Sequence, residues 1–301
     1  MKNILIIGSE GNIGKELVKH LKSKGYNVFE SDQNPGWRKN YYQASINNSI
    51  DLSNIFEIVK PDTVYHLAAM VSRVTCEATP GLAVETNLMG LQNVIELCKK
   101  YNSKMIYFST SEVYGNQSEI LCEEKTNPAP NNRYGLTKYL GEKLVEHDVK
   151  YHNLKAVTVR PFMFYHEDET RGDHRSAMIR FIESLAKGKK IEVHMGSERA
   201  WFHLDDAVRA LEKVAKVSKY NVYNLGSDEY IATEKLAEII AEELNVNIKD
   251  YAEYLTLPNQ MTLSKRPLLE KMHNELKVKA TIKIKDGIKR VISKMKDNGE
   301  I

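Results

Sequence analysis

The chain is poor in cysteine and has no long apolar segment. Its three cysteines, Cys76, Cys98 and Cys122, are widely spaced and odd in number, which fits neither a disulfide framework nor a metal-binding cysteine motif. This usage suits a reducing cytoplasm. No signal peptide is visible and no apolar run is long enough to cross a bilayer, so we expect a soluble, cytoplasmic protein.

The chain also lacks a large excess of positive or negative charge. The formal net charge is +3, from 43 Lys and Arg against 40 Asp and Glu, so no nucleic-acid surface is expected. The lysine-rich end at residues 277–296 is expected to be solvated surface. With 301 residues the chain can bury a large core in one or two domains.

The sequence does contain a regular alternation of strand and helix patterns. Helical patterns at Pro80–Tyr101 and Tyr134–Asp148 lie between apolar strand patterns, which predicts an α/β fold with a doubly wound parallel sheet. We expect residues 1–160, with returning segments from about 200–228, to form one domain. Residues 161–301 are expected to form mostly a smaller C-terminal α/β lobe. The strand patterns are Ile4–Ile7, Asn27–Ser31, Thr63–Leu67, Lys104–Ser109 and Ala156–Arg160.

A glycine-rich turn follows the first strand pattern. Gly8, Gly11 and Gly14 lie between that strand and a helical pattern at Lys15–Lys24. This is the context of the Rossmann-type dinucleotide fingerprint. Glycines let the backbone approach a pyrophosphate, and the N-terminus of the helix offers free N–H donors. The turn therefore predicts a dinucleotide cofactor.

An acidic residue selects between the two nicotinamide dinucleotides. Asp32 ends the second strand pattern, 18 residues past Gly14, where a carboxylate is expected to bind the adenosine ribose hydroxyls. A carboxylate there repels a 2′-phosphate, so NAD is expected rather than NADP. Arg38 and Lys39 follow closely enough to leave NADP open.

Tyr134 and Lys138 are four residues apart on a helical pattern, which places the hydroxyl and the ammonium group on one face. A tyrosine has a reference pKa of about 10, and lowering it by roughly three units takes about 4 kcal/mol. A fixed cation nearby supplies part of that stabilisation. The pair is therefore typical of a tyrosine that acts as a base.

Taken together, these segments resemble the extended short-chain dehydrogenase/reductase family, from Lys2 to about Ile292. The family includes NAD-dependent nucleotide-sugar epimerases, dehydratases and decarboxylases. The motifs are the GxxGxxG turn, Asp51-Leu52, residues 66–69 (His-Leu-Ala-Ala), residues 109–115 (Ser-Thr-Ser-Glu-Val-Tyr-Gly), the YxxxK pair and Arg160-Pro161. The resemblance implies cofactor contacts at Gly8, Gly11, Asn12, Ile13, Gly14, Asp32, Asp51, Leu52, Leu67, Ala68, Ala69, Ser109, Tyr134, Lys138 and Arg160.

The resemblance also implies the chemistry. Tyr134 would take the proton from a sugar hydroxyl, usually at C4, while hydride passes to NAD. Lys138 would hold the nicotinamide ribose and lower the tyrosine pKa, and Thr110 would hydrogen-bond the reacting hydroxyl. Glu112 could serve as the acid/base that dehydration needs at C5. Ser111 stands where some dehydratases carry Asp, which weakens the case for dehydration.

Several outcomes stay open. We expect an epimerase or dehydratase of a nucleoside-diphosphate sugar, acting in surface-polysaccharide or glycoconjugate synthesis. Residues 109–115 also resemble the active-site string of UDP-glucuronate decarboxylases, and nearly that of GDP-mannose 4,6-dehydratases. A uronate decarboxylase and a net dehydrogenase or reductase are the alternatives. A non-catalytic NAD-binding regulator would usually have lost the Tyr or the Lys, and this chain has both. Glu112 could instead cap a loop or face solvent.

Substrate contacts are less regular. Arg199 and Arg266 resemble two family arginines that bind the substrate diphosphate, as suits planar phosphate recognition. Met163 replaces a common Asn and His166 a common Gly, so the substrate could bind differently. His166 and His174 have acids between them, but their spacing does not support a metal site and none is expected.

Two further expectations come from the resemblance. Asn87 matches an asparagine that bonds backbone near the active site, which is a structural role. Homodimers of the family pair the two helices equivalent to Pro80–Tyr101 and Tyr134–Asp148, and the first carries more apolar residues than one buried face needs. A homodimer is therefore expected.

Overall fold

A computed structural model describes residues 2–117, 120–170, 176–256 and 264–301. The chain divides into two compact units, each assembled from separate segments. Unit 1 consists of Met1–Gly115, Asn127–Pro161 and Val208–Asn224. Unit 2 consists of Asn116–Thr126, Phe162–Ala207 and Leu225–Ile301.

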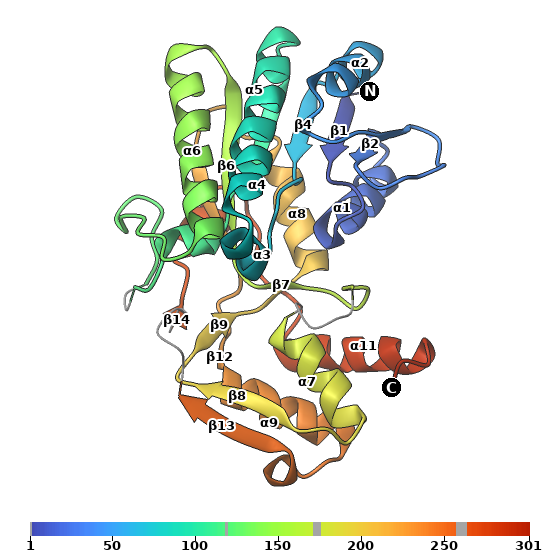
Figure 1. Ribbon diagram of the computed structural model, residues 1–301, viewed down its shortest axis with the longest axis vertical. Helices are drawn as coiled ribbons and strands as arrows, with labels where there is room; N and C mark the ends of the chain where they lie inside the picture. Colours follow the sequence, from blue (N-terminus) through green and yellow to red (C-terminus); the bar gives the residue numbers. More distant parts are fainter. Residues whose placement is uncertain (1, 118–119, 171–175, 257–263) are drawn as a thin grey trace. The chain divides into compact units, whose positions relative to one another are not determined.

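Unit 1 is built on a seven-stranded parallel sheet in the order β11-β6-β5-β4-β1-β2-β3 (Figure 1). The predicted doubly wound α/β fold is therefore confirmed. The strand order reverses between β1 and β4, and ligands of such sheets bind at the carboxyl ends of the strands beside this point. The strands are β1 (Asn3–Ile7), β2 (Asn27–Asp32), β3 (Tyr41–Gln43), β4 (Thr63–His66), β5 (Lys104–Phe108), β6 (Lys155–Pro161) and β11 (Val222–Leu225).

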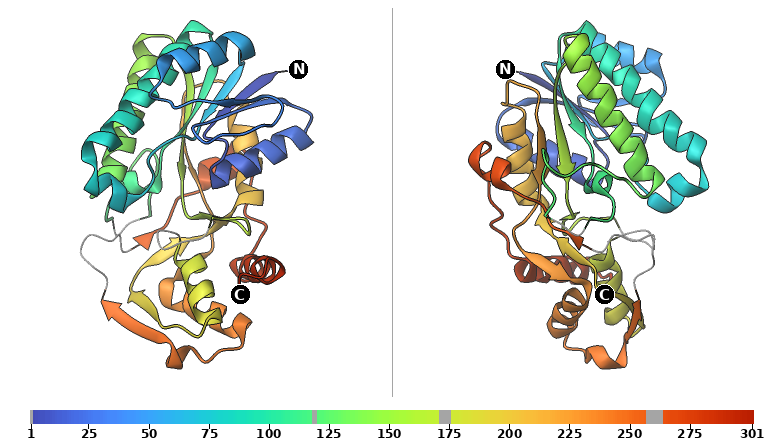
Figure 2. Two further views of the ribbon diagram at one scale, coloured as in Figure 1. Left: turned by 45° about the vertical axis from the view of Figure 1, so that its right-hand side comes forward. Right: turned by 90° about the vertical axis from the view of Figure 1, so that its left-hand side faces the viewer.

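Helices cover both faces of this sheet. Figure 2 shows α1 and α8 on one face and α2, α5 and α6 on the other. The second face buries apolar side chains such as Phe56, Val94, Ile95 and Val145 against the strands, and this burial drives the layering. The helical segments are α1 (Asn12–Ser23), α2 (Ser49–Val59), α3 (Arg73–Ala78), α4 (Pro80–Val84), η1 (Glu85–Met89), α5 (Gly90–Lys100), η2 (Ser111–Tyr114), α6 (Arg133–Tyr151) and α8 (Leu204–Val214).

One helix of unit 1 differs from the sequence expectation. Pro80–Tyr101 was expected to be a single regular helix, but its middle segment η1 is π-helical, between α4 and α5. A π-helical turn adds a residue to the turn and is found most often at functional sites. Asn87 lies in η1 and is buried.

Unit 2 has its own apolar core, formed by α7, α9 and α11 with residues such as Phe181, Ile240 and Val291. Across the described residues, no helix has both the length and the apolar character needed to cross a bilayer. The elements are β7 (Phe164–Tyr165), α7 (Ala177–Ala186), β8 (Ile191–Met195), β9 (Glu198–Ala200), β10 (Phe202–His203), β12 (Tyr230–Ala232), α9 (Thr233–Leu244), η3 (Ile248–Asp250), β13 (Ala252–Thr256), β14 (Ser264–Lys265), α10 (Glu270–Asn274) and α11 (Ile284–Asp297).

A buried ion pair fixes α6 to the sheet. Nε and Nη2 of Arg160, on β6, donate to the two carboxylate oxygens of Glu142, on α6, at 2.8 and 2.7 Å. Nη1 of Arg160 donates to the Tyr114 hydroxyl at 2.8 Å. Both charged side chains are 5% exposed. One guanidinium thus joins α6, β6 and η2.

We predict that Glu142→Ala lowers the free energy of unfolding by about 3–5 kcal/mol, because it leaves the buried guanidinium of Arg160 without a counter-ion. Glu146→Ala is the matched control, since its partner Lys143 is 2.7 Å away on an exposed part of the same helix. That variant should lose at most about 1 kcal/mol. Urea unfolding followed by circular dichroism measures both. Equal losses in the two variants would contradict the assignment.

Candidate active site

The glycine-rich turn follows β1 and abuts the loop after β4. Gly8 has a φ of +92°, and a Cβ there would lie 2.7 Å from the backbone nitrogen of Ala68. A Cβ on Gly14 would lie 2.3 Å from the carbonyl oxygen of Gly8. The chain itself therefore requires both glycines. The backbone N–H groups of Leu67 and Ala68 donate to the Ile7 carbonyl, which holds the two loops together.

Gly11 is different, because the protein does not need it to be glycine. Its φ is −69°, and the nearest atom to an added Cβ is the Gly8 carbonyl oxygen at 3.4 Å. Gly11 is also the N-cap of α1 and supplies no side-chain cap. A bare backbone at an uncapped helix N-terminus is suited to a phosphate group. The geometry thus fits the pyrophosphate of a dinucleotide.

The carboxyl ends of the neighbouring strands also fit a dinucleotide. Within the described residues of unit 1, four buried side-chain atoms have no hydrogen-bond partner: Oγ of Ser9, Ser31 and Ser109, and Nδ1 of His66. They follow or end β1, β2, β5 and β4, at the carboxyl edge of the sheet. Buried polar atoms are normally paired. Their grouping at the edge where the fold binds nucleotides supports a cofactor there.

Asp32 ends β2 and is held by the backbone. Its Oδ2 accepts the N–H of Glu10 at 3.0 Å, and its Oδ1 accepts the N–H of Asn34 at 3.0 Å. Asn12 and Ile13 open α1 beside this group. The carboxylate therefore stands where the sequence predicts a ribose contact.

Two of the other expected cofactor residues have structural partners. Asp51 lies in the first turn of α2, where its Oδ2 accepts from the Asn48 side chain at 2.6 Å. Leu52 is fully buried in the core of unit 1. Ala69 follows the loop that touches Gly8 and is partly exposed. Their contacts with the cofactor stay predictions.

The side chain of Arg160 has a structural role. Three of its nitrogen atoms are engaged by Glu142 and Tyr114, and the residue is 4% exposed. The expected contact of Arg160 with NAD stays a prediction. Sequence reasoning missed the role because its partner Glu142 lies on a different element.

Tyr134 and Thr110 lie side by side. Tyr134 is in the first turn of α6, and Thr110 is the N-cap of η2, accepting the Glu112 N–H at 3.2 Å. Gly135 allows the approach, because a Cβ there would lie 2.7 Å from the Glu112 carbonyl oxygen. Burial raises the pKa of Tyr134, a hydrogen bond with Thr110 lowers it, and the charge of Glu112 raises it. The net effect is a raised pKa, so the lowering by Lys138 stays a prediction.

Lys138 is buried one turn further along α6. Its Nζ lies 4.4 Å from the ring centroid of Tyr107. Burial lowers the pKa of Lys138 to about 7, although the charge of Glu142 acts to raise it. Burial and the charge of Lys138 also lower the pKa of His66 to about 3, so that imidazole is neutral. The ammonium group can therefore change its protonation near neutral pH.

Ser111 and Glu112 follow Thr110 in the short helix η2. The Oε2 atom of Glu112 accepts from the side-chain amide of Asn132 at 2.9 Å. Asn132 is the N-cap of α6, and its Oδ1 accepts the Gly135 N–H at 2.8 Å. Ser111 is buried in η2. Glu112 is thus tied to the helix that carries Tyr134, a link through Asn132 that sequence reasoning missed.

Asn87 connects the loop after β4 with α6. Its Oδ1 accepts the Met70 N–H at 2.8 Å, and its Nδ2 donates to the Met70 carbonyl at 3.1 Å and to Thr137 Oγ1 at 3.0 Å. Thr137 lies between Tyr134 and Lys138 on α6. The π-helical turn aims this amide, and it joins the loop after β4 to the catalytic helix.

Three expected substrate residues lie in unit 2. Met163 packs against the apolar core of that unit. Arg199 is on β9, and its Nη1 donates to the Glu198 carbonyl at 2.8 Å. The Nε of Arg266 donates to Glu198 Oε2 at 2.8 Å, and its guanidinium faces the Tyr230 ring at 5.8 Å. Their roles in diphosphate binding stay predictions.

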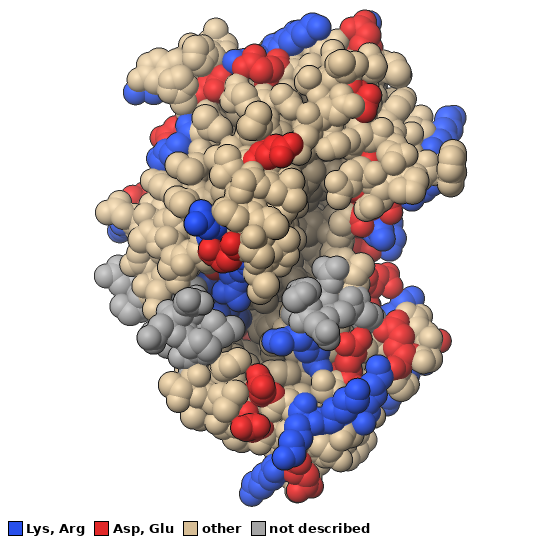
Figure 3. Space-filling model, in the orientation of Figure 1, with Lys and Arg blue, Asp and Glu red and all other residues tan. Residues whose placement is uncertain are grey.

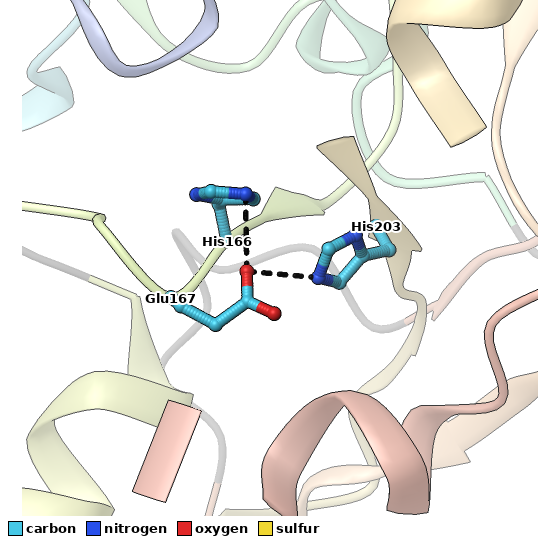
Figure 4. Close-up of side chains that lie close together, drawn as sticks. All are labelled: His166, Glu167 and His203. Carbon is cyan, nitrogen blue, oxygen red and sulfur yellow. Dashed lines mark hydrogen bonds and ion pairs between the residues drawn. The ribbon is translucent and has the colours of Figure 1, made fainter. Parts of the chain in front are cut away.

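His166 belongs to a cluster that sequence reasoning did not find (Figure 4). Its Nε2 lies 3.0 Å from Oε2 of Glu167, and Nε2 of His203 lies 3.2 Å from the same oxygen. These atoms lie within 4.8 Å of one another, as in a metal site. However, Nδ1 of His166 accepts the Asp168 N–H at 3.2 Å, and Nδ1 of His203 accepts the Asp205 N–H at 3.1 Å.

The acceptor role of both Nδ1 atoms places the hydrogens on Nε2. Each imidazole therefore donates to Glu167, whereas a metal ligand needs the Nε2 lone pair and usually donates through its other nitrogen. Burial acts to raise the pKa of Glu167, but the hydrogen bond from His203, a backbone hydrogen bond and the charges of the two imidazoles together lower it to about 2. The geometry favours a hydrogen-bonded carboxylate over a metal centre. His174 lies outside the described residues.

We predict that Gly11→Ala weakens NAD⁺ binding at least about tenfold while changing the free energy of unfolding of the cofactor-free protein by less than about 0.5 kcal/mol. The added methyl has room in the protein but occupies the phosphate approach. Calorimetric titration and thermal unfolding measure the two quantities. Gly81→Ala is the control, since its Cβ would meet nothing within 4 Å. Unchanged NAD⁺ affinity would refute the role of Gly11.

Known proteins share this sequence pattern. The family model for the NAD dependent epimerase/dehydratase family matches residues 4–226. A dTDP-D-glucose 4,6-dehydratase of Dictyostelium discoideum is 30% identical over 278 residues, which cover 82% of this chain and 63% of that protein. A UDP-glucuronate 4-epimerase of Thermodesulfobacterium geofontis is 26% identical over 318 residues, which cover 99% of this chain and 97% of the relative.

Solved structures share the fold. A UDP-glucose 4-epimerase of Thermotoga maritima, determined with UDP-glucose, matches with a TM-score of 0.91 at 23% identity, covering 98% of this chain and 99% of the other. The Thermus thermophilus UDP-glucose 4-epimerase in complex with NAD has a TM-score of 0.88 at 21% identity, covering 98% and 99%. The expected family, fold and NAD cofactor are confirmed. From β1 to just past β11, the chain carries the family's pattern on the family's fold, and it belongs to the NAD-dependent epimerase/dehydratase family.

Proposed function

We propose that this enzyme acts on a nucleoside-diphosphate sugar, which it oxidises transiently at C4 and then epimerises or dehydrates. The observation that carries the proposal is the hydrogen bond between Thr110 and Tyr134, one turn from the buried Lys138. The relatives named for UDP-glucuronate and dTDP-D-glucose support the substrate class. All three cysteines are free, which supports a cytoplasmic location.

In this proposal, Tyr134, Thr110 and Lys138 have separate roles in proton transfer. NAD, when bound, accepts a hydride and returns it. Tyr134 removes the proton of the reacting hydroxyl, and Thr110 holds that hydroxyl through a hydrogen bond. Because the pKa of Lys138 is about 7, this lysine is close to half protonated at neutral pH and can supply positive charge beside the tyrosinate. Asn87 keeps the intervening Thr137 in place.

A specific contact favours dehydration as the second step. The Glu112 carboxylate is beside Tyr134 and is held by the Asn132 amide rather than left to solvent. A hydrogen-bond donor on a carboxylate favours its ionised form. The carboxylate can therefore take a proton from the carbon next to the C4 keto group, which epimerisation by hydride return does not require. Epimerisation remains the first alternative, and decarboxylation or net redox the next.

The test is to incubate the protein with UDP-, GDP-, CDP- and dTDP-sugars and their uronates, without added reductant, and to identify products by mass spectrometry and NMR. Loss of one water identifies a dehydratase, an unchanged mass with a new NMR species an epimerase, and loss of carbon dioxide a decarboxylase. Net NADH formation would identify a dehydrogenase. No conversion of any sugar would refute the proposed substrate class.

With the substrate identified, we predict that Tyr134→Phe lowers kcat at least about 100-fold, because proton transfer by a positioned side chain contributes about 10²–10⁴-fold. The Kd for NAD⁺ should change by less than about threefold, since one hydroxyl contributes a single hydrogen bond. Tyr139→Phe, five positions along the same helix, is the control and should retain activity. Full turnover in Tyr134→Phe would refute the catalytic assignment.

We also propose a homodimer formed through the face of α4, η1 and α6. These segments pack together, and large apolar side chains on them stay exposed. Figure 3 shows mostly uncharged side chains over α5 and α6. Contiguous exposed apolar surface of this kind marks an interface. The exposed residues are Leu82 at 45%, Val84 at 44%, Met89 at 63%, Leu136 at 42% and Leu140 at 42%.

We predict that Leu140→Asp shifts the protein from dimer to monomer, because it places a charge in the apolar interface. Size-exclusion chromatography with light scattering measures the mass. Ile58→Asp, at an equally apolar and 64% exposed site on α2, is the control and should leave the mass unchanged. A monomeric wild-type protein at micromolar concentration would refute the dimer.

A further inference from the structure

Arg38 lies where an NADP-binding site would need an arginine, but its guanidinium is already hydrogen-bonded to two carboxylates of the protein. Arg38 lies on the segment between β2 and β3, six residues after Asp32. In dinucleotide folds an arginine near this acid accommodates the 2′-phosphate of NADP. The sequence alone therefore leaves both cofactors possible.

The guanidinium of Arg38 is held by two carboxylates. Its Nη2 and Nε donate to Glu30 Oε2 at 2.7 and 3.2 Å. Its Nη2 also donates to Glu10 Oε1. The flat face lies over the Tyr41 ring, 4.8 Å from the centroid. Two acids and an aromatic ring thus fix the group in one place.

The carboxylates of Glu10 and Glu30 differ in burial and in their other partners. The Glu30 side chain is 3% exposed and also pairs with Lys22 at 2.6 Å. Glu30 is therefore part of the interior and cannot lose its charge without leaving cations unpaired. The Glu10 side chain is 18% exposed, and its backbone N–H donates to Asp32. Glu10 thus connects the ribose-binding acid with the arginine.

Two cations of this region are already paired with carboxylates. Glu10, Glu30 and Asp32 supply three negative charges, while Arg38 is bound to Glu10 and Glu30, and Lys22 is bound to Glu30. A 2′-phosphate brought beside Asp32 would meet carboxylates whose cations are already engaged.

We propose that Glu10, together with Glu30, makes the enzyme selective for NAD by sequestering Arg38. Asp32 repels the 2′-phosphate, and Glu10 engages an arginine that could otherwise compensate. Neutralising Glu10 releases one side of the guanidinium so that Arg38 can turn to the phosphate. The selectivity of this chain is therefore set by a side chain that need not touch the cofactor.

The test compares the Kd values of NAD⁺ and NADP⁺ by calorimetric titration of the full-length protein after removal of bound nucleotide. In Glu10→Gln the affinity for NADP⁺ should rise at least about tenfold relative to wild type, which corresponds to about 1.4 kcal/mol. The affinity for NAD⁺ should change by less than about threefold. Glu96→Gln, on α5 with a 59% exposed side chain, removes the same charge elsewhere and should change neither constant.

Two further variants identify the group responsible. Adding Arg38→Met to Glu10→Gln should abolish the gain in NADP⁺ affinity, because the phosphate then has no arginine to bind. Arg38→Met alone should not weaken NADP⁺ binding relative to NAD⁺, since the wild-type arginine is engaged elsewhere. A selective loss of NADP⁺ affinity in that single variant would overturn the proposal even if Glu10→Gln failed to fold. Equal gains for both cofactors, or none in a folded Glu10→Gln, would also overturn it.

Discussion

The arrangement of the catalytic side chains depends on the buried contact between Arg160 and Glu142. Moving two charges out of water is expensive, so such a pair contributes little net stability compared with apolar packing. Its value here is geometric, because three donors of one rigid guanidinium reach α6 and η2 from a sheet strand. The elements that carry Tyr134 and Thr110 are thereby held in one relative position.

The cofactor region is built mainly from backbone. Gly8 and Gly14 are required by the chain's own close packing, whereas Gly11 is not, which is why we expect Gly11 to serve the ligand. The hydrogen bond from the Glu10 N–H joins the glycine-rich turn to Asp32, the expected ribose contact. If both expectations hold, one residue of the turn couples phosphate binding with the choice of nucleotide.

Much of this could be read from the sequence, because the signals are local. Apolar periodicity gave the five central strands, and the spacing of Tyr134 and Lys138 placed them on one helix. The engagement of Arg38 and Arg160 could not be read, since their acids lie on other elements and side-chain pairing over such separations has no sequence signature. The sequence also did not predict the π-helical turn at Asn87, because the spacing of apolar residues does not reveal one extra residue in a helix. Arg199 and Arg266 stay predictions.

The π-helical segment η1 has a consequence for how this gene can change. A π turn contains one residue more than an α turn and is locally less favourable. A one-codon deletion within η1 would let α4 and α5 join as a continuous α-helix with better backbone bonding. The same deletion would rotate the Asn87 amide away from Met70 and Thr137. The length of this helix is therefore tied to the contacts of Asn87 and not only to regular backbone hydrogen bonding.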